Sequence, residues 1–401
     1  MKILQITQRF NPSISGSQYH VYRISKELIR LGHEVTVLTT MSMHNKDIRG
    51  FSTSRPFTLK SINPALPKFE HMEGMKVYRF KPIFQFWMHM SNPSMFIFLL
   101  KHIHKYDVVH GHVYMGAESN MAAKVCRLRK IPFIFTAHDL LSTQREAIIV
   151  LLKDLYDKIE GRFTLNTAKK LIALTSENKK QYESLNISED KIRIIPNGVD
   201  YEKFDNLTKS KKLLKNIGSP EKVVLFVARL VKYKGAQHII KAIPEINNDY
   251  PDIKFVFIGE DQGYKKELVQ LAKNLDVFDK CIFTGKVDEK DLLKYYSIAD
   301  VFILPSIGEG FGLVALEAIA SGIPVILADA GGLKHILSEI GGYPIDMAKD
   351  IPKQIVENVK NIFSDPSIDS EIERGKEVLK RYYTWGRVAK MIERVYKEVI
   401  S

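Results

Sequence analysis

The stretch SIGEGFGLVALEAIASGIPVI, residues 306–326, determines how the rest of the sequence is interpreted. The apolar run in front of it predicts a strand, and LVALEAIASG predicts a helix. Gly310 and Gly312 lie at the junction, where glycine lets the backbone come close to a ligand. Glu309 stands just before the glycines, and Glu317 lies about one and a half turns inside the helix. The stretch therefore predicts a strand, a ligand-binding turn and a buried helix.

The two glutamates are predicted to bracket a ligand. Unpaired N–H groups at a helix start attract phosphate, and Phe311 and Leu313 flank the glycines at that start. Glu317 is expected to accept hydrogen bonds from a ribose diol, as the acid of dinucleotide-binding folds does. Glu309, outside the helix, is expected to contact a second hydroxylated group beyond the phosphates. The predicted ligand is thus a sugar joined through a diphosphate to a ribose.

Apolar runs alternate with helical patterns along the whole chain, which predicts parallel sheets covered by helices. In the first half, a helix is predicted at 18–31 and strands at 2–6, 32–40, 107–112, 132–139, 170–175 and 192–198. The pattern then restarts, with strands predicted at 222–230, 253–260, 280–287, 300–306 and 323–329. Proline and glycine in PNGVD, 196–200, interrupt the pattern between the two halves.

The sequence therefore predicts an α/β protein with two tandem Rossmann-like domains, 1–196 and 197–380, and a cleft between them. The last segment, 381–401, contains a predicted helix with Thr384 as a plausible N-cap. Its apolar stripe must pack on another element. We expect this helix to cross back to the first domain. The stripe consists of Trp385, Val388, Ile392, Val395 and Val399.

Composition restricts the class of protein. Hydrophobic residues make up 45% and charged residues 26% of the 401, as in a soluble globular protein. Cys126 and Cys281 are far apart, which argues against a disulfide framework and a cysteine metal site. No secretory signal is visible, and the longest apolar runs have six residues, against about 20 for a membrane-spanning helix. We expect a cytoplasmic protein.

The net charge of +13 is confined to the first half of the chain. Residues 1–196 hold 29 Lys and Arg against 16 Asp and Glu, whereas residues 197–401 hold 30 against 30. Such a one-sided basic domain indicates a polyanionic partner, unless the surface serves only solubility. Nucleic acid is excluded as that partner, because the sequence contains no recognisable nucleic-acid-binding module.

Further polar residues follow other predicted strands. Arg229 and Lys234 come after the first strand of the second domain and suit a diphosphate clamp. His138 ends a strand of the first domain, where it could orient or deprotonate a hydroxyl. Gly16 lies in a serine–glycine loop that could touch phosphate.

No Asp-x-Asp pair and no His/Cys cluster with metal spacing occurs in the sequence. We therefore expect fixed cations to neutralise the phosphates, without a metal or a cofactor.

With these pieces in order, nearly the whole chain resembles the retaining, nucleotide-sugar-dependent glycosyltransferases of the GT-B type, in the group 1 family. The matching pieces are LGHEVTVLT, DVVHGH, IPFIFTAHD, KIRIIPNGVD, LFVARLVKYKG and EGFGLVALEAIASGIPVI. Two positions depart from the family pattern. Ser15 stands in place of the first glycine of an N-terminal pair, and His335 stands where a glutamate often follows a later glycine pair.

The resemblance implies roles for these residues. Arg229 and Lys234 would hold the diphosphate of a UDP- or GDP-linked donor, and Glu317 would bind the ribose. Glu309 would contact the donor sugar, and His138 would lie near the reacting centre. The sugar would keep its anomeric configuration.

The expected acceptor is a hydroxyl of a lipid-linked or cell-surface glycan precursor, used at the inner face of the cell membrane. Basic and apolar segments at 80–105 and 144–162 could then dock on an anionic bilayer. Two alternatives stay open: a synthase that makes a soluble disaccharide or glycosylated metabolite, and a nucleotide-sugar 2-epimerase on the same fold.

Overall fold

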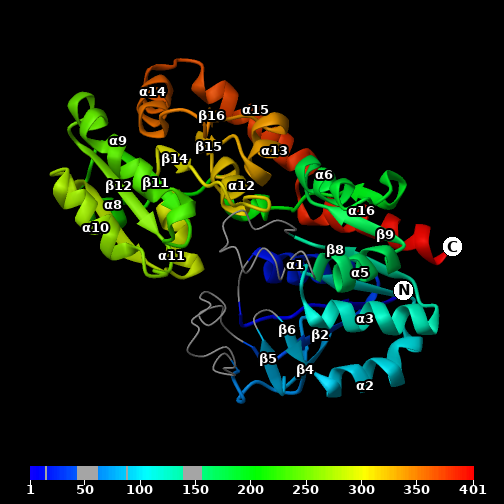
Figure 1. Ribbon diagram of the computed structural model, residues 1–401. Coiled ribbons are helices and arrows are strands. Elements are labelled where there is room, and N and C mark those ends of the chain that lie inside the picture. The colour runs from blue at the N-terminus through cyan, green and yellow to red at the C-terminus, as the bar shows by residue number, and fades with distance from the viewer. Residues whose placement is uncertain (14–15, 43–61, 87–88, 139–155) are drawn as a thin grey trace. The chain divides into compact units, whose positions relative to one another are not determined.

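The computed structural model describes residues 1–13, 16–42, 62–86, 89–138 and 156–401 (Figure 1). The chain forms two compact units, and each is described by itself. Unit 1 consists of Met1–Gly198 and Trp385–Ser401, and unit 2 is Val199–Thr384. These limits lie a few residues from the predicted ones. At the junction, the Val199 N–H donates to the Tyr383 carbonyl at 2.7 Å, and both residues belong to unit 2.

Unit 1 contains an eight-stranded sheet in the order β10-β9-β8-β7-β1-β2-β4-β3. All neighbours are parallel except β3 and β4. The sheet strands are β1 (Lys2–Ile6), β2 (Glu34–Thr40), β3 (Phe69–Met72), β4 (Met75–Phe80), β7 (Val108–His112), β8 (Phe133–Thr136), β9 (Lys170–Ala173) and β10 (Ile192–Ile194). β5 (Phe84–Phe86) and β6 (His89–Ser91) form a separate hairpin.

Helices cover both faces of this sheet. One face carries a core to which α2 and α3 contribute Met95, Leu99, Val125 and Cys126. On the other face, α1 packs against α16. The helices of unit 1 are α1 (Gly16–Arg30), α2 (Pro93–His102), α3 (Ala117–Arg129), α5 (Arg162–Thr167), α6 (Ser176–Ser184) and α16 (Trp385–Ile400).

Unit 2 contains a six-stranded parallel sheet in the order β13-β12-β11-β14-β15-β16. Its strands are β11 (Lys222–Val227), β12 (Ile253–Ile258), β13 (Cys281–Gly285), β14 (Val301–Leu304), β15 (Val325–Ala328) and β16 (Tyr343–Ile345). Its helices are α7 (Tyr201–Phe204), α8 (Lys211–Asn216), α9 (Ala236–Asp249), α10 (Lys265–Asn274), α11 (Glu289–Tyr296), α12 (Leu313–Ala320), α13 (Gly331–Glu339), α14 (Ile351–Ser364) and α15 (Ile368–Tyr382).

The last helix, α16, returns to unit 1, as the fold prediction required. Its predicted stripe is buried at Trp385, Val388, Ile392 and Val395. Glu393 accepts a hydrogen bond from His33 Nε2 at 3.0 Å, which ties the helix to the chain just before β2. Burial of each of these side chains contributes about 1.5–3 kcal/mol, so the stripe is a major part of this face of the core.

The prediction of two Rossmann-like domains is confirmed, but five strands were missed. β3, β5 and β6 have only three or four residues each. β4 is longer and alternates, with Met75 and Val77 buried, but was missed. β16 contains Pro344, which argues against a strand in sequence reasoning. Among the described residues, no helix combines the length and the apolar character that crossing a membrane requires.

We predict that Trp385→Ala destabilises unit 1 by about 3–5 kcal/mol, because a large buried side chain leaves a cavity. Trp385 is 2% exposed and packs edge-on against Tyr19 and His20. Urea unfolding measures the loss. The exposed Lys390 on the same helix supplies the control, since Lys390→Ala should change stability by less than about 0.5 kcal/mol. Equal stability of the two variants would contradict the prediction.

Candidate active site

The candidate residues form two groups, one in each unit, and the first group lies where the strand order of unit 2 reverses. The chain runs outward from β11 to β12 and β13, and then continues with β14 on the other side of β11. Ligands of open α/β sheets bind beyond the carboxyl ends of the strands at such a switch point. Residues 306–312, here called the glutamate–glycine loop, follow β14 directly, and Arg229 and Lys234 follow β11.

Two close backbone approaches fix the shape of the glutamate–glycine loop. Gly312 caps α12 with a φ of 103°, a conformation that glycine adopts without strain. Gly332, in the first turn of α13, donates its N–H to the carbonyl of Glu309 at 2.8 Å. A Cβ atom on Gly332 would lie 2.4 Å from the Cα of Phe311. Only glycine therefore allows α13 to pack against this loop.

The two predicted cations are linked through Tyr233, whose ring centroid lies 5.1 Å from Lys234 Nζ, and Lys234 is paired with the first glutamate. Lys234, which is 6% exposed, donates through Nζ to Glu309 Oε1 and to the Gly308 carbonyl, the latter at 3.3 Å. Arg229 donates to the Tyr233 hydroxyl at 2.8 Å and to Gln262 Oε1 at 3.2 Å. The Arg229 partners are neutral, so its positive charge stays available to an anion.

The second glutamate, Glu317, lies within α12 between buried apolar neighbours. Its Oε2 accepts a hydrogen bond from the Tyr296 hydroxyl at 2.9 Å. Burial raises the pKa of Glu317 to about 7, and the Tyr296 hydrogen bond opposes that rise. The carboxyl group therefore changes charge near neutral pH. No contact between Glu317 and Glu309 is recorded within the described part of unit 2.

The remaining predicted residues of this loop have different exposures. Phe311 is buried, Gly310 and Leu313 are half-buried, and Leu313 begins α12. His335, the departure from the family pattern, lies in α13 beside Phe311, with ring centroids 6.0 Å apart. Its Nε2 is 3.2 Å from the Tyr383 hydroxyl. The imidazole therefore has a hydrogen-bond partner inside unit 2.

The second group of candidate residues lies at the corresponding switch point of unit 1, between β1 and β7. His138 follows β8 and has a φ of 64°. Val113 and Met115, just after β7, also have positive φ values, 72° and 64°. Such a φ is unusual for a β-branched residue such as Val113. Strained backbone of this kind is concentrated at functional sites.

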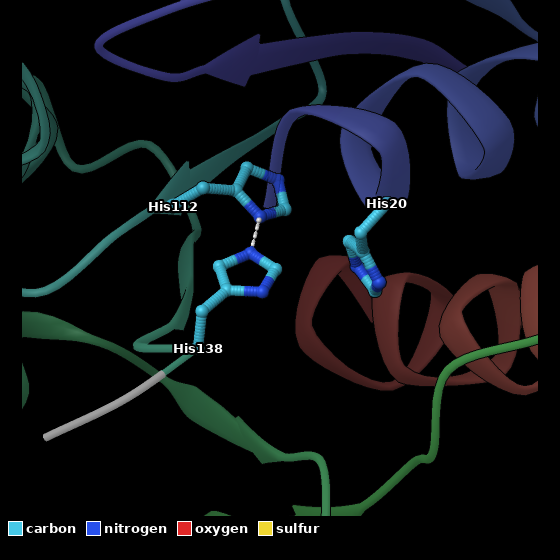
Figure 2. A group of neighbouring side chains, drawn as sticks. All are labelled: His20, His112 and His138. Carbon is cyan, nitrogen blue, oxygen red and sulfur yellow. Dashed lines mark hydrogen bonds between the residues drawn. The ribbon is translucent and has the colours of Figure 1, made fainter. Parts of the chain in front are cut away.

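His138 belongs to a histidine cluster, which is defined here as His20, His112 and His138 (Figure 2). One ring nitrogen from each lies within 4.8 Å of the others, a grouping that could hold a metal ion. The members come from α1, β7 and the end of β8. Spacing along the sequence could not reveal this group, because its members are far apart in the chain.

Gly16 begins α1 and is exposed, whereas Ser15 lies outside the described residues.

Sequence reasoning missed two buried charged residues near this switch point. Arg9 follows β1, and burial lowers its pKa to about 10. Glu118 lies in the first turn of α3, and burial raises its pKa to about 7. The sequence did carry a signal for Glu118, because this acid is the second residue of a helix that directly follows Gly116.

Comparison with known proteins places the chain in a family. The group 1 glycosyl transferase model matches residues 208–377, and the glycosyltransferase family 4 model matches residues 14–203. An uncharacterized glycosyltransferase of Methanocaldococcus jannaschii is 31% identical over 416 residues, covering 99% of this chain and 98% of that protein. The chain belongs to the group 1 glycosyltransferases.

More distant relatives of this glycosyltransferase cover most of the chain as well. The phosphatidylinositol N-acetylglucosaminyltransferase gpi3 subunit of Schizosaccharomyces pombe is 25% identical, covering 99% of this chain and 80% of the relative. Among solved structures, Anabaena HepE in complex with UDP and glucose has a TM-score of 0.76 at 18% identity, covering 99% and 100% of the two chains. Sucrose-phosphate synthase from Thermosynechococcus elongatus has a TM-score of 0.73 at 21% identity, covering 99% and 98%. These structures share the GT-B fold.

We predict that this glycosyltransferase loses stability on mild acidification. Burial lowers the pKa of His110, His112 and His138 well below 6.5, and that of His20 to about 4. These side chains stay neutral in the folded state, whereas the unfolded chain protonates them below about pH 6.5. The unfolded state then binds more protons than the folded state, so the free energy of unfolding decreases as the pH decreases. The raised pKa values of Glu118 and Glu317 act in the opposite direction, but near pH 6 four histidines outweigh two carboxyls.

The measurement is the melting temperature from about pH 7.5 to about pH 5.5, with calorimetry in two buffers of different ionisation enthalpy to count protons. Unfolding near pH 6 should take up protons. A melting temperature that stays constant or rises on acidification would show that these histidines are already charged in the folded protein.

Proposed function

We propose that this glycosyltransferase transfers a hexosyl group from a UDP- or GDP-sugar to a hydroxyl of a lipid-linked or cell-surface glycan precursor, with retention of configuration and without a divalent metal. The cluster of Arg229, Lys234 and Glu309 supports the proposal most directly. It combines two fixed cations with a carboxylate at the switch point of unit 2, where a diphosphate and its sugar would bind together.

The chemistry follows from that cluster. The bond between the anomeric carbon and the diphosphate oxygen breaks, and the acceptor oxygen bonds to that carbon on the same face. The acceptor proton passes to the departing phosphate oxygen. Negative charge grows on the diphosphate as the bond breaks, and Arg229 and the N–H groups at the start of α12 would stabilise it. Glu309 would fix a hydroxyl of the sugar, and Glu317 the ribose.

The choice of donor and acceptor is supported by the relatives. Anabaena HepE was solved with UDP and with UDP-glucose. The phosphatidylinositol N-acetylglucosaminyltransferase gpi3 subunit of Schizosaccharomyces pombe resembles this chain over nearly its whole length, and its name describes a lipid acceptor. The net charge of +13 suits an acceptor at an anionic membrane surface.

We predict that Arg229→Ala lowers kcat by about 10²–10³, the usual loss for one well-placed electrostatic contact. Its neutral partners, Tyr233 and Gln262, leave no unpaired buried charge behind, so the variant should stay folded. Transfer from a labelled donor is measured by product analysis, in which an epimerase would yield no transferred label. Lys232→Ala is the control, because Lys232 is exposed in the same turn.

The same assay tests the metal and the stereochemistry. EDTA should leave the wild-type rate unchanged, and NMR of the product should show the anomeric configuration of the donor. A rate abolished by EDTA, or an inverted product, would overturn those parts of the proposal.

Glu317→Gln should weaken donor binding by about 10- to 100-fold, because a hydrogen bond to a charged group contributes about 1.5–3 kcal/mol. Since the pKa of Glu317 is raised to about 7, the wild-type affinity should increase as the pH rises through that value. The variant should lack this pH dependence. Calorimetric titration with the nucleoside diphosphate measures both effects, with the exposed Glu357→Gln as control. Unchanged affinity would reject the ribose role.

The structure refines the predicted membrane-docking segments. In 80–105, α2 exposes Phe96 and Ile97, by 36% and 51%. The neighbouring α3 exposes Leu128 by 68%, and Arg129 near its end donates to the Leu100 carbonyl at 3.4 Å. Exposed basic side chains surround these residues, namely Lys101, Lys105, Lys124, Arg127, Arg129 and Lys130. In 144–162, the residues up to 155 lie outside the described part of the chain.

Each Lys or Arg near an anionic leaflet contributes about 1 kcal/mol, so we propose that this α2–α3 surface docks on the membrane. The protein should co-sediment with phosphatidylglycerol vesicles at low salt and dissociate as salt rises. Leu128→Asp should weaken binding, whereas Phe278→Asp, at an exposed apolar residue of unit 2, should not. Equal binding to neutral vesicles, or no binding to either, would contradict docking and favour a soluble acceptor.

A further inference from the structure

We propose that Gln5 and Tyr396 are positioning residues that hold His138 in one neutral tautomer, with the proton on Nε2 and the lone pair on Nδ1. This inference rests on the proposed function and on the place near the reacting centre that the family resemblance implies for His138. It gives a function to Gln5 and Tyr396, two buried polar residues that have no role in the proposed transfer chemistry.

A continuous chain of hydrogen bonds joins these residues inside unit 1. His138 Nε2 lies 3.2 Å from His112 Nδ1, and His112 Nε2 lies 2.7 Å from Gln5 Oε1. Gln5 Nε2 donates to the Tyr396 hydroxyl at 3.0 Å. That hydroxyl lies 2.8 Å from His110 Nδ1, and His110 Nε2 lies 2.8 Å from Thr136 Oγ1. Gln5, His110, His112 and Tyr396 are all 0% exposed.

The direction of each bond follows from Gln5. Its Oε1 can only accept, so His112 carries a proton on Nε2 and a lone pair on Nδ1. His138 must then donate from Nε2 to that lone pair, which leaves Nδ1 of His138 as an acceptor. On the other side of Gln5, the Tyr396 hydroxyl accepts from the amide and donates its own proton to His110.

Reversing the Gln5 amide would reverse every bond in the chain and move the His138 lone pair to Nε2. The orientation of one side-chain amide therefore decides what His138 offers to a ligand. In the described orientation, Nδ1 has no hydrogen-bond partner in the described part of the chain, and His138 is partly exposed. A lone pair there suits a substrate hydroxyl, which donates a hydrogen bond.

His20 holds the plane of the His138 ring. The two rings meet edge to face at 81°, with centroids 4.8 Å apart. His20 is fixed in turn, because its Nδ1 lies 2.6 Å from Asn197 Oδ1. Figure 2 shows the close pair of His112 and His138, with His20 beside it. Orientation and tautomer of His138 are thus set by different neighbours.

A hydrogen-bonded pair and a metal centre place different requirements on His112 and His138. A bond at 3.2 Å needs one proton between Nδ1 and Nε2. A metal ion would need a lone pair on both of these nitrogens. Because His112 Nε2 donates to the Gln5 carbonyl, the lone pair of His112 is on Nδ1. The proton shared with His138 therefore belongs to His138 Nε2.

The test reads the tautomer directly by ¹⁵N NMR of the imidazole nitrogens in the whole protein. Wild-type His138 should show a protonated Nε2 and an unprotonated Nδ1. Gln5→Met removes both amide contacts and should give a mixture of tautomers. Gln5→Glu keeps an acceptor for His112 and should restore the wild-type tautomer. Tyr396→Phe should also produce a mixture, whereas Tyr156→Phe, which removes another buried hydroxyl of unit 1, should not.

Activity gives a second readout. Gln5→Met should lower kcat by about 10- to 100-fold with little change in KM for the donor, because a misplaced substrate hydroxyl can cost about 10² in rate. Gln5→Glu should recover most of that loss. If His138→Ala retains full activity while the NMR result holds, the role of His138 in transfer fails and the tautomer control stands.

Three results would overturn the inference. These are an Nδ1-protonated His138 in the wild type, a single unchanged tautomer in Gln5→Met, and one equivalent of zinc retained after dialysis without chelator. The last result would identify the histidine cluster as a metal centre.

Discussion

Burying a polar group costs free energy unless the group finds a hydrogen-bond partner inside the protein. This constraint explains the contacts of the candidate residues in each unit. In unit 2 it joins Lys234 to Glu309 and Tyr296 to Glu317. In unit 1 it produces a chain of five hydrogen bonds from His138 to Thr136. The same bonds that make burial tolerable also fix the direction in which each functional group can donate or accept.

The sequence was sufficient for those features that depend on neighbours along the chain. Strand and helix periodicity predicted the two domains, and the spacing of Glu309, Gly312 and Glu317 predicted a turn and a buried helix. β3, β5 and β6, with three or four residues each, are too short to carry a comparable pattern. β4 does carry it, because Met75 and Val77 alternate with Lys76 and are buried, so this strand was within reach of sequence reasoning.

Features that depend on distant residues were not predictable. Gln5 and Tyr396 are separated by 391 positions, and His110 and Tyr396 by 286. Residues so far apart leave no pattern in the sequence that would predict their contact. Without the fold, Gln5 is only a polar residue within a predicted strand. The contact of Arg229 with Gln262 was missed for the same reason, because 33 positions separate the two residues. A cation after a strand could be predicted, but its neutral partners required the fold.

The return of α16 to unit 1 has a consequence for synthesis. Residues 385–401 complete the face on which Gln5 and His110 lie, yet the ribosome makes them only after the whole of unit 2. At about 5–20 residues per second, the nascent first unit waits roughly 10 to 40 s for its last helix. During that interval the polar chain around Gln5 lacks Tyr396. Translation order therefore delays the maturation of the histidine cluster until α16 has been made.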